Sequence, residues 1–214
     1  MTLRLKIDPG KTDGEKLTEA VRILREGGVV AFPTETFYGL GADARNETAV
    51  EKIFRIKGRN FRKPLPVIVA DDGELSGLAE EIPEAAAILM QTFWPGPLTL
   101  IFRATPSVSS RLTGGTGKIG IRVSSHPVAG FLAAGLAGPL TATSANLSGG
   151  PECSSADAVI RALDDLPDAV IDGGATPGGA GSTILDVTLS PPRILREGAI
   201  PRRLIMNALS LTES

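Results

Sequence analysis

Residues 29–59 of this chain read VVAFPTETFYGLGADARNETAVEKIFRIKGR. The apolar run over residues 29–32 predicts a short buried strand, which gives way at Pro33 to a loop whose bends carry glycine. Asn46 is a favourable N-cap residue, and apolar positions recur behind it at helical spacing, so a helix is expected from Asn46 to about Ile56. The stretch therefore predicts a strand followed by a helix, with cationic residues where the helix ends.

The same alternation of strands and helices continues along the chain. Apolar runs predict further strands over residues 65–70, 98–102, 119–123, 140–143, 169–172, 183–187 and 193–196. Helices are predicted over residues 14–26 with Asp13 as the cap, over 83–93, 127–136 and 155–164, and after Pro201. Because these elements interleave without a regular βαβ cadence, we expect an α/β fold with a twisted, mixed β-sheet flanked by helices. No linker interrupts the pattern, so residues 1–214 are expected to form a single domain.

The composition narrows the possible function classes. The formal net charge of −2 gives no bulk attraction to nucleic acid or acidic membranes. His126 and Cys153 are the single histidine and cysteine, which excludes a zinc site of His and Cys ligands and an intramolecular disulfide. We expect His126 to cap a helix, and Cys153 has no cationic sequence neighbour to activate it. No apolar run is long enough to span a membrane, and no signal peptide is evident, so a cytoplasmic protein is expected.

The motif Lys57-Gly58-Arg59 places two cations at the end of a predicted helix. Together with Arg62 and Lys63 it gives four cations within a short segment. One interpretation is a solvated helix end, where cations interact favourably with the helix dipole. The other is a grip for phosphate or carboxylate oxygens, because arginine presents a planar fork of donors. The residues alone leave both interpretations open.

A second polar motif, Ser144-Ala145-Asn146, ends the apolar run over residues 140–143, and glycines follow at 149 and 150. These residue types favour a simple turn. The glycines would also let the backbone approach phosphate oxygens at a strand end, as in an anion or nucleotide cradle. A further glycine-rich loop over residues 114–117 ends at Lys118. Neither a Walker motif nor the glycine pattern of a dinucleotide-binding fold is present.

Two further positions combine polar side chains with apolar surroundings. Arg122 lies inside an apolar run, where a charge is rarely fully buried without a partner. It faces either solvent at a rim or a pocket that holds a carboxylate. Thr34, Glu35 and Thr36 follow the first buried strand and either form a turn or cap, or hold a ligand at the strand end.

Taken in order, these segments resemble the threonylcarbamoyl-AMP synthase family of the YrdC or TsaC type. The matching stretches are collinear over nearly the whole chain and comprise residues 32–42, 57–59, 63–65, 94–99, 120–123, 126–127, 143–146, 148–149, 171–174, 181–183 and 194–196. The paired Lys-x-Arg and Ser-x-Asn motifs are the family's signature, which makes the resemblance specific. It implies a YrdC-like fold, a twisted mixed-sheet α/β domain with a concave basic surface. It also implies that the chain corresponds to the catalytic domain alone.

The resemblance implies a nucleotidyltransferase that forms L-threonylcarbamoyladenylate and pyrophosphate from L-threonine, bicarbonate and ATP. The product serves the t6A37 modification of tRNA, so tRNA would be an indirect partner through t6A transfer proteins. No protein nucleophile is needed, because the threonine amine attacks bicarbonate and the carbamate attacks the α-phosphate. Converging cations would offset the repulsion between these anionic reactants. Mg²⁺ is expected on the phosphates, held mainly by ATP, and no protein motif for a metal is evident.

The resemblance also carries roles to individual positions. The residues expected to hold threonine are Thr36, Arg122 and Ser182. The residues expected to hold ATP are Arg59, Lys63, Lys118, Ser144 and Arg196. Lys57 and Asn146 complete the catalytic signature with Arg59 and Ser144, and are expected near the reacting phosphate and carbamate. Ile68 stands where some members carry a histidine that contacts threonine.

Two other functions remain open at this point. One is a related enzyme that makes a carbamoyl adenylate from carbamoyl phosphate, although such modules usually lie in much longer chains. The other is a non-catalytic protein that binds double-stranded RNA, a partner that the family's concave basic surface suggests. The acidic net charge weighs against this RNA-binding alternative.

Overall fold

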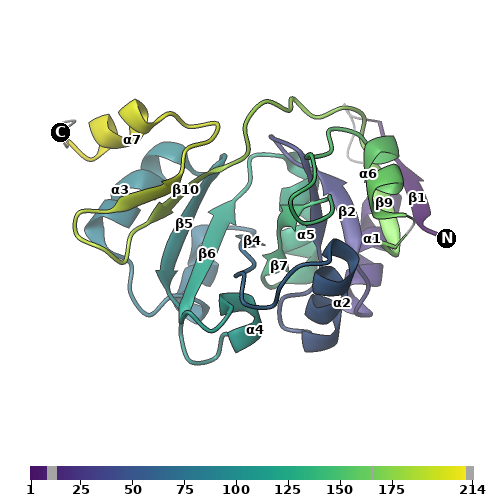
Figure 1. The fold of residues 1–214 in the computed structure, drawn as a ribbon, viewed down its shortest axis with the longest axis horizontal. Coiled ribbons are helices and arrows are strands. Elements are labelled where there is room, and N and C mark those ends of the chain that lie inside the picture. Colours follow the sequence, from purple (N-terminus) through teal and green to yellow (C-terminus); the bar gives the residue numbers. More distant parts are fainter. Residues whose placement is uncertain (9–13, 165, 211–214) are drawn as a thin grey trace.

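The computed structural model describes residues 1–8, 14–164 and 166–210, and its strands form two sheets (Figure 1). The five-stranded sheet has the order β1 (Leu3–Lys6), β9 (Ala169–Asp172), β2 (Val30–Pro33), β3 (Tyr38–Gly41) and β8 (Thr143–Ser144). The six-stranded sheet has the order β11 (Arg193–Arg196), β10 (Thr183–Asp186), β5 (Leu98–Arg103), β6 (Lys118–Val123), β4 (Val67–Val69) and β7 (Leu140–Thr141). The helices are α1 (Gly14–Arg25), α2 (Glu47–Lys57), α3 (Glu84–Phe93), α4 (Ser110–Thr113), α5 (Pro127–Leu136), α6 (Ala156–Leu163), α7 (Arg202–Ala208) and the 3-10 helix η1 (Asp72–Gly77).

Both sheets contain parallel and antiparallel neighbours. In the five-stranded sheet, β9 is parallel to β1 and β2, whereas β3 is antiparallel to β2 and β8. In the six-stranded sheet, β10 is parallel to β5 and β4 is parallel to β6, and the other pairs are antiparallel. The predicted α/β class with mixed pairing and flanking helices is confirmed. The strands divide between two sheets, however, where the sequence analysis expected one.

The chain passes between the sheets inside the segment that was expected to be a single strand over residues 140–143. β7 pairs with β4 in the six-stranded sheet, and β8 pairs with β3 in the five-stranded sheet. Between them lies Ala142, whose amide N donates to the carbonyl O of Pro66 at 2.8 Å. The second polar motif, which begins at Ser144, therefore lies at the junction of the two sheets.

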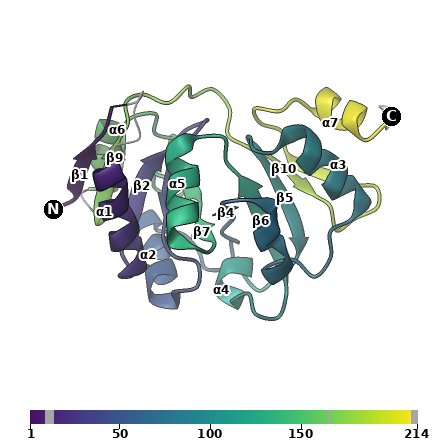
Figure 2. The same ribbon diagram turned by 180° about the vertical axis from the view of Figure 1, so that it is seen from behind.

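Helices cover both faces of the five-stranded sheet. Along β2, Ala31 packs in a core cluster with α2 and α6, whereas Val30 and Phe32 pack in a second cluster with α1 and α5. This alternation follows from the two-residue period of a strand. Figure 2 shows α1 and α5 side by side on one side of the molecule. The first cluster also contains Leu100 of the six-stranded sheet, so the core is continuous between the sheets.

The helix before the first cationic motif begins and ends as the sequence predicts. Asn46 is the N-cap of α2, and its Oδ1 accepts a hydrogen bond from the amide N of Ala49 at 3.1 Å. Gly58 ends the helix in the left-handed conformation, with a φ of 56° that favours glycine. Lys57 is thus the last residue of the helix, and Arg59 belongs to the loop that follows.

The strand β3 was not predicted, because its glycines favoured a loop. In the structure, the amide N of Thr34 donates to the carbonyl O of Phe37 at 3.2 Å and closes a tight turn, so β3 returns alongside β2. Gly41 allows close packing in this strand. A Cβ there would lie 2.7 Å from the carbonyl O of Thr141 and 2.8 Å from the ring of Phe32. Glycine here marks a close approach inside a strand and not a bend.

The other predicted helices and strands are present, with ends that differ slightly from those expected, and the sequence analysis also missed β1, α4 and η1. Asp13, expected to cap α1, lies outside the described residues. Within the described residues, no helix is long and apolar enough to cross a membrane.

Candidate functional site

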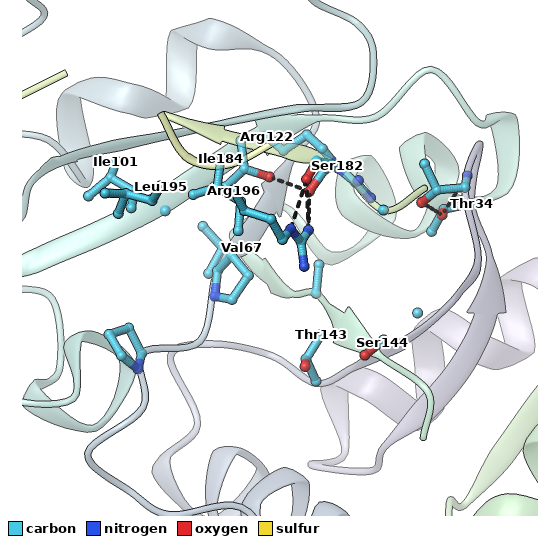
Figure 3. A pocket seen from close by; sticks show the side chains of 18 of the residues that line it. Thr34, Val67, Ile101, Arg122, Thr143, Ser144, Ser182, Ile184, Leu195 and Arg196 are labelled. Carbon is cyan, nitrogen blue, oxygen red and sulfur yellow. Dashed lines mark hydrogen bonds between the residues drawn. The ribbon is translucent and has the colours of Figure 1, made fainter. Parts of the chain in front are cut away.

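A cavity of about 510 Å³ lies where the two sheets meet (Figure 3). Both sheets contribute to its lining, with Ser144 from the five-stranded sheet and Ile101 and Arg122 from the six-stranded sheet. The predicted site residues that line the cavity are Thr36, Arg59, Lys118, Arg122, Ser144, Ser182 and Arg196. The fold thus brings together side chains that are far apart in the sequence.

The two ends of the cavity differ in character. Ile101, Ile184 and Leu195 lie together at one end, and Thr34 and Arg122 lie at the opposite end (Figure 3). An apolar wall suits a flat heterocycle, whereas convergent polar groups orient a small charged molecule. The cavity can therefore accommodate a ligand, or a pair of ligands, that is apolar at one end and anionic at the other.

Arg122 lines the polar end from β6 and is only 8% exposed. Its Nη1 atom lies 3.9 Å from Oε1 of Glu35, an ion pair too long to be a hydrogen bond. Burial lowers the pKa of Arg122, the charge of Glu35 opposes this shift, and the charge of Arg196 adds to it. Because arginine remains protonated in proteins, Arg122 offers N–H donors to a carboxylate or phosphate in the cavity.

Arg196 is held in place by the chain segment that contains Ser182. Its Nε and Nη2 atoms donate to the carbonyl O of Ser182 at 3.1 and 2.7 Å, and Nη2 also lies 3.2 Å from the Ser182 hydroxyl (Figure 3). That hydroxyl is 3.0 Å from the hydroxyl of Thr99 on β5. These bonds occupy one edge of the guanidinium, so Arg196 has a defined orientation in the cavity wall.

Arg59 reaches the cavity from the loop after α2. Its Nη2 atom donates to the carbonyl O of Pro64 at 2.9 Å, and its buried Nε has no hydrogen-bond partner among the described residues. Burial lowers the pKa of Arg59. A buried N–H without an acceptor is unfavourable, so the hydrogen-bonding capacity of Arg59 is only partly used within the described residues.

Lys57 does not line the cavity, in contrast to the expectation that it lies near a reacting phosphate. The residue is 2% exposed, and its ammonium donates to the carbonyl O of Ser144, to the carbonyl O of Asn146 at 2.7 Å and to Oδ1 of Asn146 at 3.2 Å. The three N–H donors of the ammonium are therefore engaged within the protein. Burial lowers the pKa of Lys57 to about 8, and the neighbouring charge of Arg59 also lowers it.

Asn146 also lies behind the cavity wall. Its Oδ1 accepts a hydrogen bond from Oγ of Ser144 at 2.6 Å, and its Nδ2 donates to the carbonyl O of Gly150. Of the Ser-x-Asn motif, Ser144 alone lines the cavity. Lys57 and Asn146 are thus placed to fix the turn that presents Ser144.

Lys118 lines the cavity but is paired with a carboxylate that the sequence analysis missed. Its Nζ donates to Oδ2 of Asp186 at 2.8 Å, across from β6 to β10. Burial alone would raise the pKa of Asp186, but hydrogen bonds from Lys118 and Thr188 outweigh burial and lower it. The ammonium of Lys118 is therefore partly neutralised and attracts a phosphate less strongly than a free lysine would.

Two other expected positions lie away from the cavity. Lys63 is exposed on the loop after α2 and is not among the lining residues. Ile68 is fully buried in the core cluster with α1 and α5, so it faces the core and not the cavity. The adjacent Val67 lines the cavity instead, as the alternation of side chains along a strand requires.

His126 and Cys153 have structural environments. Nδ1 of His126 accepts from the amide N of Val128 at 3.2 Å and caps α5 as predicted, and burial lowers the pKa of the imidazole. Cys153 is buried, and burial raises the pKa of its thiol, which disfavours the thiolate. Among the residues that the structure describes, no group of three or more His, Cys, Asp or Glu side chains is placed to hold a metal ion.

Sequence reasoning missed three carboxylates of the site. Glu152 and Asp186 line the cavity. Glu35 was interpreted as part of a turn or cap, or of a ligand-holding strand end, and its position beside Arg122 was not foreseen. These contacts join segments that are distant in sequence. The one available signal was a charged residue inside an apolar run, which Asp186 shares with Arg122.

Comparison with known proteins identifies related sequences. Residues 22–198 match a family model of Sua5, YciO and YrdC proteins that is described as "Telomere recombination". The chain is 44% identical over 186 residues to threonylcarbamoyl-AMP synthase of Pyrococcus abyssi, a match that covers 87% of this chain and 55% of that one. It is 43% identical over 199 residues to the protein of the same name from Bacillus subtilis, covering 92% of this chain and 58% of that one. The chain thus spans little more than half the length of these curated relatives.

Solved structures share the architecture. P. abyssi Sua5 complexed with L-threonine superposes with a TM-score of 0.92 at 39% identity, covering 98% of this chain and 61% of that one. E. coli YciO superposes with a TM-score of 0.85 at 31% identity, covering 93% of this chain and 97% of that one. The similarity therefore extends over nearly all of the chain.

Proposed function

Because this chain belongs to the Sua5/YciO/YrdC family, we propose that it is a threonylcarbamoyl-AMP synthase. The reaction would join L-threonine, bicarbonate and ATP into L-threonylcarbamoyladenylate, with release of pyrophosphate. The observation that carries the proposal is the cavity itself, in which the buried Arg122 faces an apolar wall at the opposite end. A relative of the same architecture has been solved with L-threonine, which supports the choice of substrate.

The chemistry needs no nucleophile from the protein. The amine nitrogen of threonine attacks the carbon of bicarbonate, and water leaves with a proton from the amine to give the carbamate. A carbamate oxygen then attacks the α-phosphorus of ATP, and the bond to the bridging oxygen breaks so that pyrophosphate departs. This sequence is compatible with the environments of His126 and Cys153, neither of which lies in the cavity lining.

Threonine is proposed to bind at the polar end of the cavity. The guanidinium of Arg122 would donate charge-assisted hydrogen bonds to the carboxylate, since its N–H donors are not used by hydrogen bonds within the described chain. Thr36 and Ser182 would complete this end through their hydroxyl groups. Binding here would place the amine toward the centre of the cavity, where bicarbonate must react.

ATP is proposed to bind with its adenine at the apolar end, against Ile101, Ile184 and Leu195. The residues proposed to contact its sugar and phosphates are Arg59, Lys118, Ser144 and Arg196. Preorganised cations of this kind stabilise charge that develops as pyrophosphate leaves. Lys63 has no place in this arrangement, and the catalytic roles of Lys57 and Asn146 become positioning roles through Ser144.

Mg²⁺ would reach the site on the triphosphate. Glu152 and Asp186 are the carboxylates of the described cavity lining, and Asp186 is already paired with Lys118, so the chain does not provide an all-protein cage. This donor set fits a hydrated Mg²⁺ that is bound mainly by phosphate oxygens, with Glu152 as the available protein ligand. When bound, the ion would neutralise phosphate charge.

The product is proposed to serve t6A modification, so tRNA would be reached indirectly through proteins that transfer the threonylcarbamoyl group. The proposal places the protein in the cytoplasm, where tRNA is used. We also propose that the described residues form one domain, because one core cluster contains residues of both sheets.

Pyrophosphate release from ATP tests the proposed function. The purified protein is assayed with L-threonine alone, with bicarbonate alone and with both, and the product is identified by mass spectrometry. Release that requires both, with a threonylcarbamoyl adenylate as product, supports the proposal. Release that requires carbamoyl phosphate instead would establish a carbamoyl-adenylate enzyme. No release, together with tight binding of double-stranded RNA, would establish a binding protein.

A further inference from the structure

Glu35 carries a buried carboxylate oxygen that makes no hydrogen bond within the described part of the chain. The residue lies in the tight turn between β2 and β3, and its Oε1 has no hydrogen-bond partner among the described residues. Its other oxygen, Oε2, accepts a hydrogen bond from Oγ of Ser124 at 2.5 Å. Because a buried acceptor without a hydrogen bond is unfavourable, a nearby positive charge is needed to stabilise this carboxylate.

Ser124 fixes the position of this carboxylate. It follows directly after β6, and its Oγ accepts from the amide N of His126 at 3.2 Å while it donates to Glu35. A hydroxyl has one donor and can accept as well, so both bonds are satisfied at once. Ser124 thereby links the turn that holds Glu35 to the end of β6 and the start of α5.

This oxygen, which makes no hydrogen bond to a described residue, faces Arg122 near the end of β6, two residues before Ser124. Oε1 of Glu35 is 3.9 Å from Nη1 of Arg122, which is close enough for strong attraction but too far for a hydrogen bond. A buried guanidinium needs a counter-charge, and Glu35 supplies it without using an N–H donor. The positive charge of Arg196 opposes the effect of Glu35, because it disfavours the charged form of Arg122.

Glu35 does not line the cavity, whereas Arg122 does. We propose that Glu35 is a positioning residue for amino-acid recognition: it holds Arg122 in place by charge and leaves the N–H donors of Arg122 free for the carboxylate of the substrate. This inference rests on the proposed function, because it takes the ligand at Arg122 to be an amino acid. Its consequence is that Glu35 controls the preference for a free carboxylate without touching the substrate.

The test measures binding of L-threonine, of L-threoninamide and of ATP to the full chain by calorimetry. In Glu35→Gln the charge is lost with little change in shape, so affinity for L-threonine should fall by about 10- to 100-fold. Affinity for ATP should change by less than about twofold, and the preference for L-threonine over its amide should shrink. Glu84→Gln, on the exposed surface of α3, is the matched control and should bind all three ligands as the wild type does.

A double-mutant cycle locates the effect at Arg122. Adding Glu35→Gln to an Arg122→Met variant should weaken L-threonine binding no further, because the residue through which Glu35 acts is already gone. If Glu35→Gln does not fold, Ser124→Ala replaces it and should lower threonine affinity selectively by releasing the carboxylate. Circular dichroism and thermal denaturation establish the folded state of each variant.

Three results would overturn the inference. Folded Glu35→Gln could bind L-threonine with wild-type affinity, it could lose threonine and ATP equally, or it could weaken threonine binding additively in the Arg122→Met background. Failure of the wild type to bind L-threonine would instead reject the proposed function, and the inference with it. The two failures are therefore distinguishable from the wild-type titration.

Discussion

The ammonium of Lys57 lies 2.7 Å from the carbonyl O of Asn146, and neither residue lines the cavity. The two members of the paired motifs that sequence reasoning placed beside the reacting groups therefore contact each other. They hold the turn from which Ser144 reaches the cavity. The hydrogen bonds of Lys57 therefore act on the architecture of the site, at the turn that presents Ser144.

Replacing Lys57 with methionine should damage both stability and turnover. Three hydrogen bonds are lost, and carbonyl oxygens of Ser144 and Asn146 are left without this donor, so the free energy of unfolding should fall by about 2 kcal/mol or more. Urea denaturation measures this loss, and pyrophosphate release measures the accompanying fall in kcat. Lys52→Met on the exposed side of α2 is the control and should change stability by less than about 0.5 kcal/mol. Equal stability of the two variants would contradict the role of Lys57.

The stability contributed by Lys57 should rise with pH in the alkaline range. Its pKa is lowered from 10.5 to about 8 in the folded chain, so between these values the unfolded chain binds more protons. The free energy of unfolding therefore increases with pH across this window, as the folded state is relieved of the buried charge. Denaturation of wild type and Lys57→Met from about pH 7 to about pH 11 isolates this contribution as a difference. A difference that is flat across this window would show that the lysine is not perturbed.

Replacing Arg122 with glutamine should abolish amino-acid use while sparing nucleotide binding. The variant removes the charge that would pair with the substrate carboxylate and leaves Glu35 without its counter-charge. We expect kcat/KM for threonine to fall by at least about 100-fold. Calorimetric titration with ATP is the control, and its affinity should remain within about threefold of wild type. If the variant loses affinity for ATP as well as for threonine, Arg122 is not specific for the amino acid.

Shortening Leu195 should weaken nucleotide binding alone. Leu195 lines the apolar end beside Ile101 and Ile184, and removing its branched end exposes part of the proposed adenine wall. The lost burial corresponds to about 1–2 kcal/mol, or roughly a 5- to 30-fold rise in KM for ATP. Leu189→Ala is a matched control, since Leu189 is similarly exposed but does not line the cavity. Steady-state kinetics with threonine saturating separates the two variants. An unchanged KM for ATP in Leu195→Ala would show that adenine does not bind at this end of the cavity.

A methyl group at Gly41 should destabilise the fold. The added Cβ would meet the carbonyl O of Thr141 at 2.7 Å and the ring of Phe32 at 2.8 Å, and both are held in the core. Overpacking of this kind costs about 1–3 kcal/mol. Gly77→Ala is the control, because a Cβ there meets nothing within 4 Å. Thermal denaturation of both should show a lower Tm for Gly41→Ala alone.

Local signals explain what the sequence predicted well. Asn46 and Gly58 bound α2 through contacts within a few residues, and His126 caps α5 in the same way. Such features depend on side-chain type and near neighbours, so they can be derived without knowing the fold.

The features that the sequence did not predict depend on contacts between segments that are distant along the chain. The division of residues 140–144 between two sheets depends on pairing with both β4 and β3, and no pattern inside the segment reveals it. Lys57 and Arg59 carry the same charge and are separated only by Gly58. Lys57 is nevertheless buried within the protein, whereas Arg59 lines the cavity. The partner of Lys118 on β10 is likewise invisible until the six-stranded sheet is assembled.

The passage of the chain from β7 to β8 sets a limit on how this protein can evolve. A single residue, Ala142, separates Thr141, which pairs in one sheet, from Thr143, which pairs in the other. An inserted or deleted residue would reverse the inward and outward parity of β8, and the hydroxyl of Ser144 would turn from the cavity to the opposite face. A change in the length of this crossing therefore alters both the strand pairing of β8 and the direction of Ser144. The number of residues between Leu140 and Ser144 is therefore under its own constraint, separate from the identity of these residues.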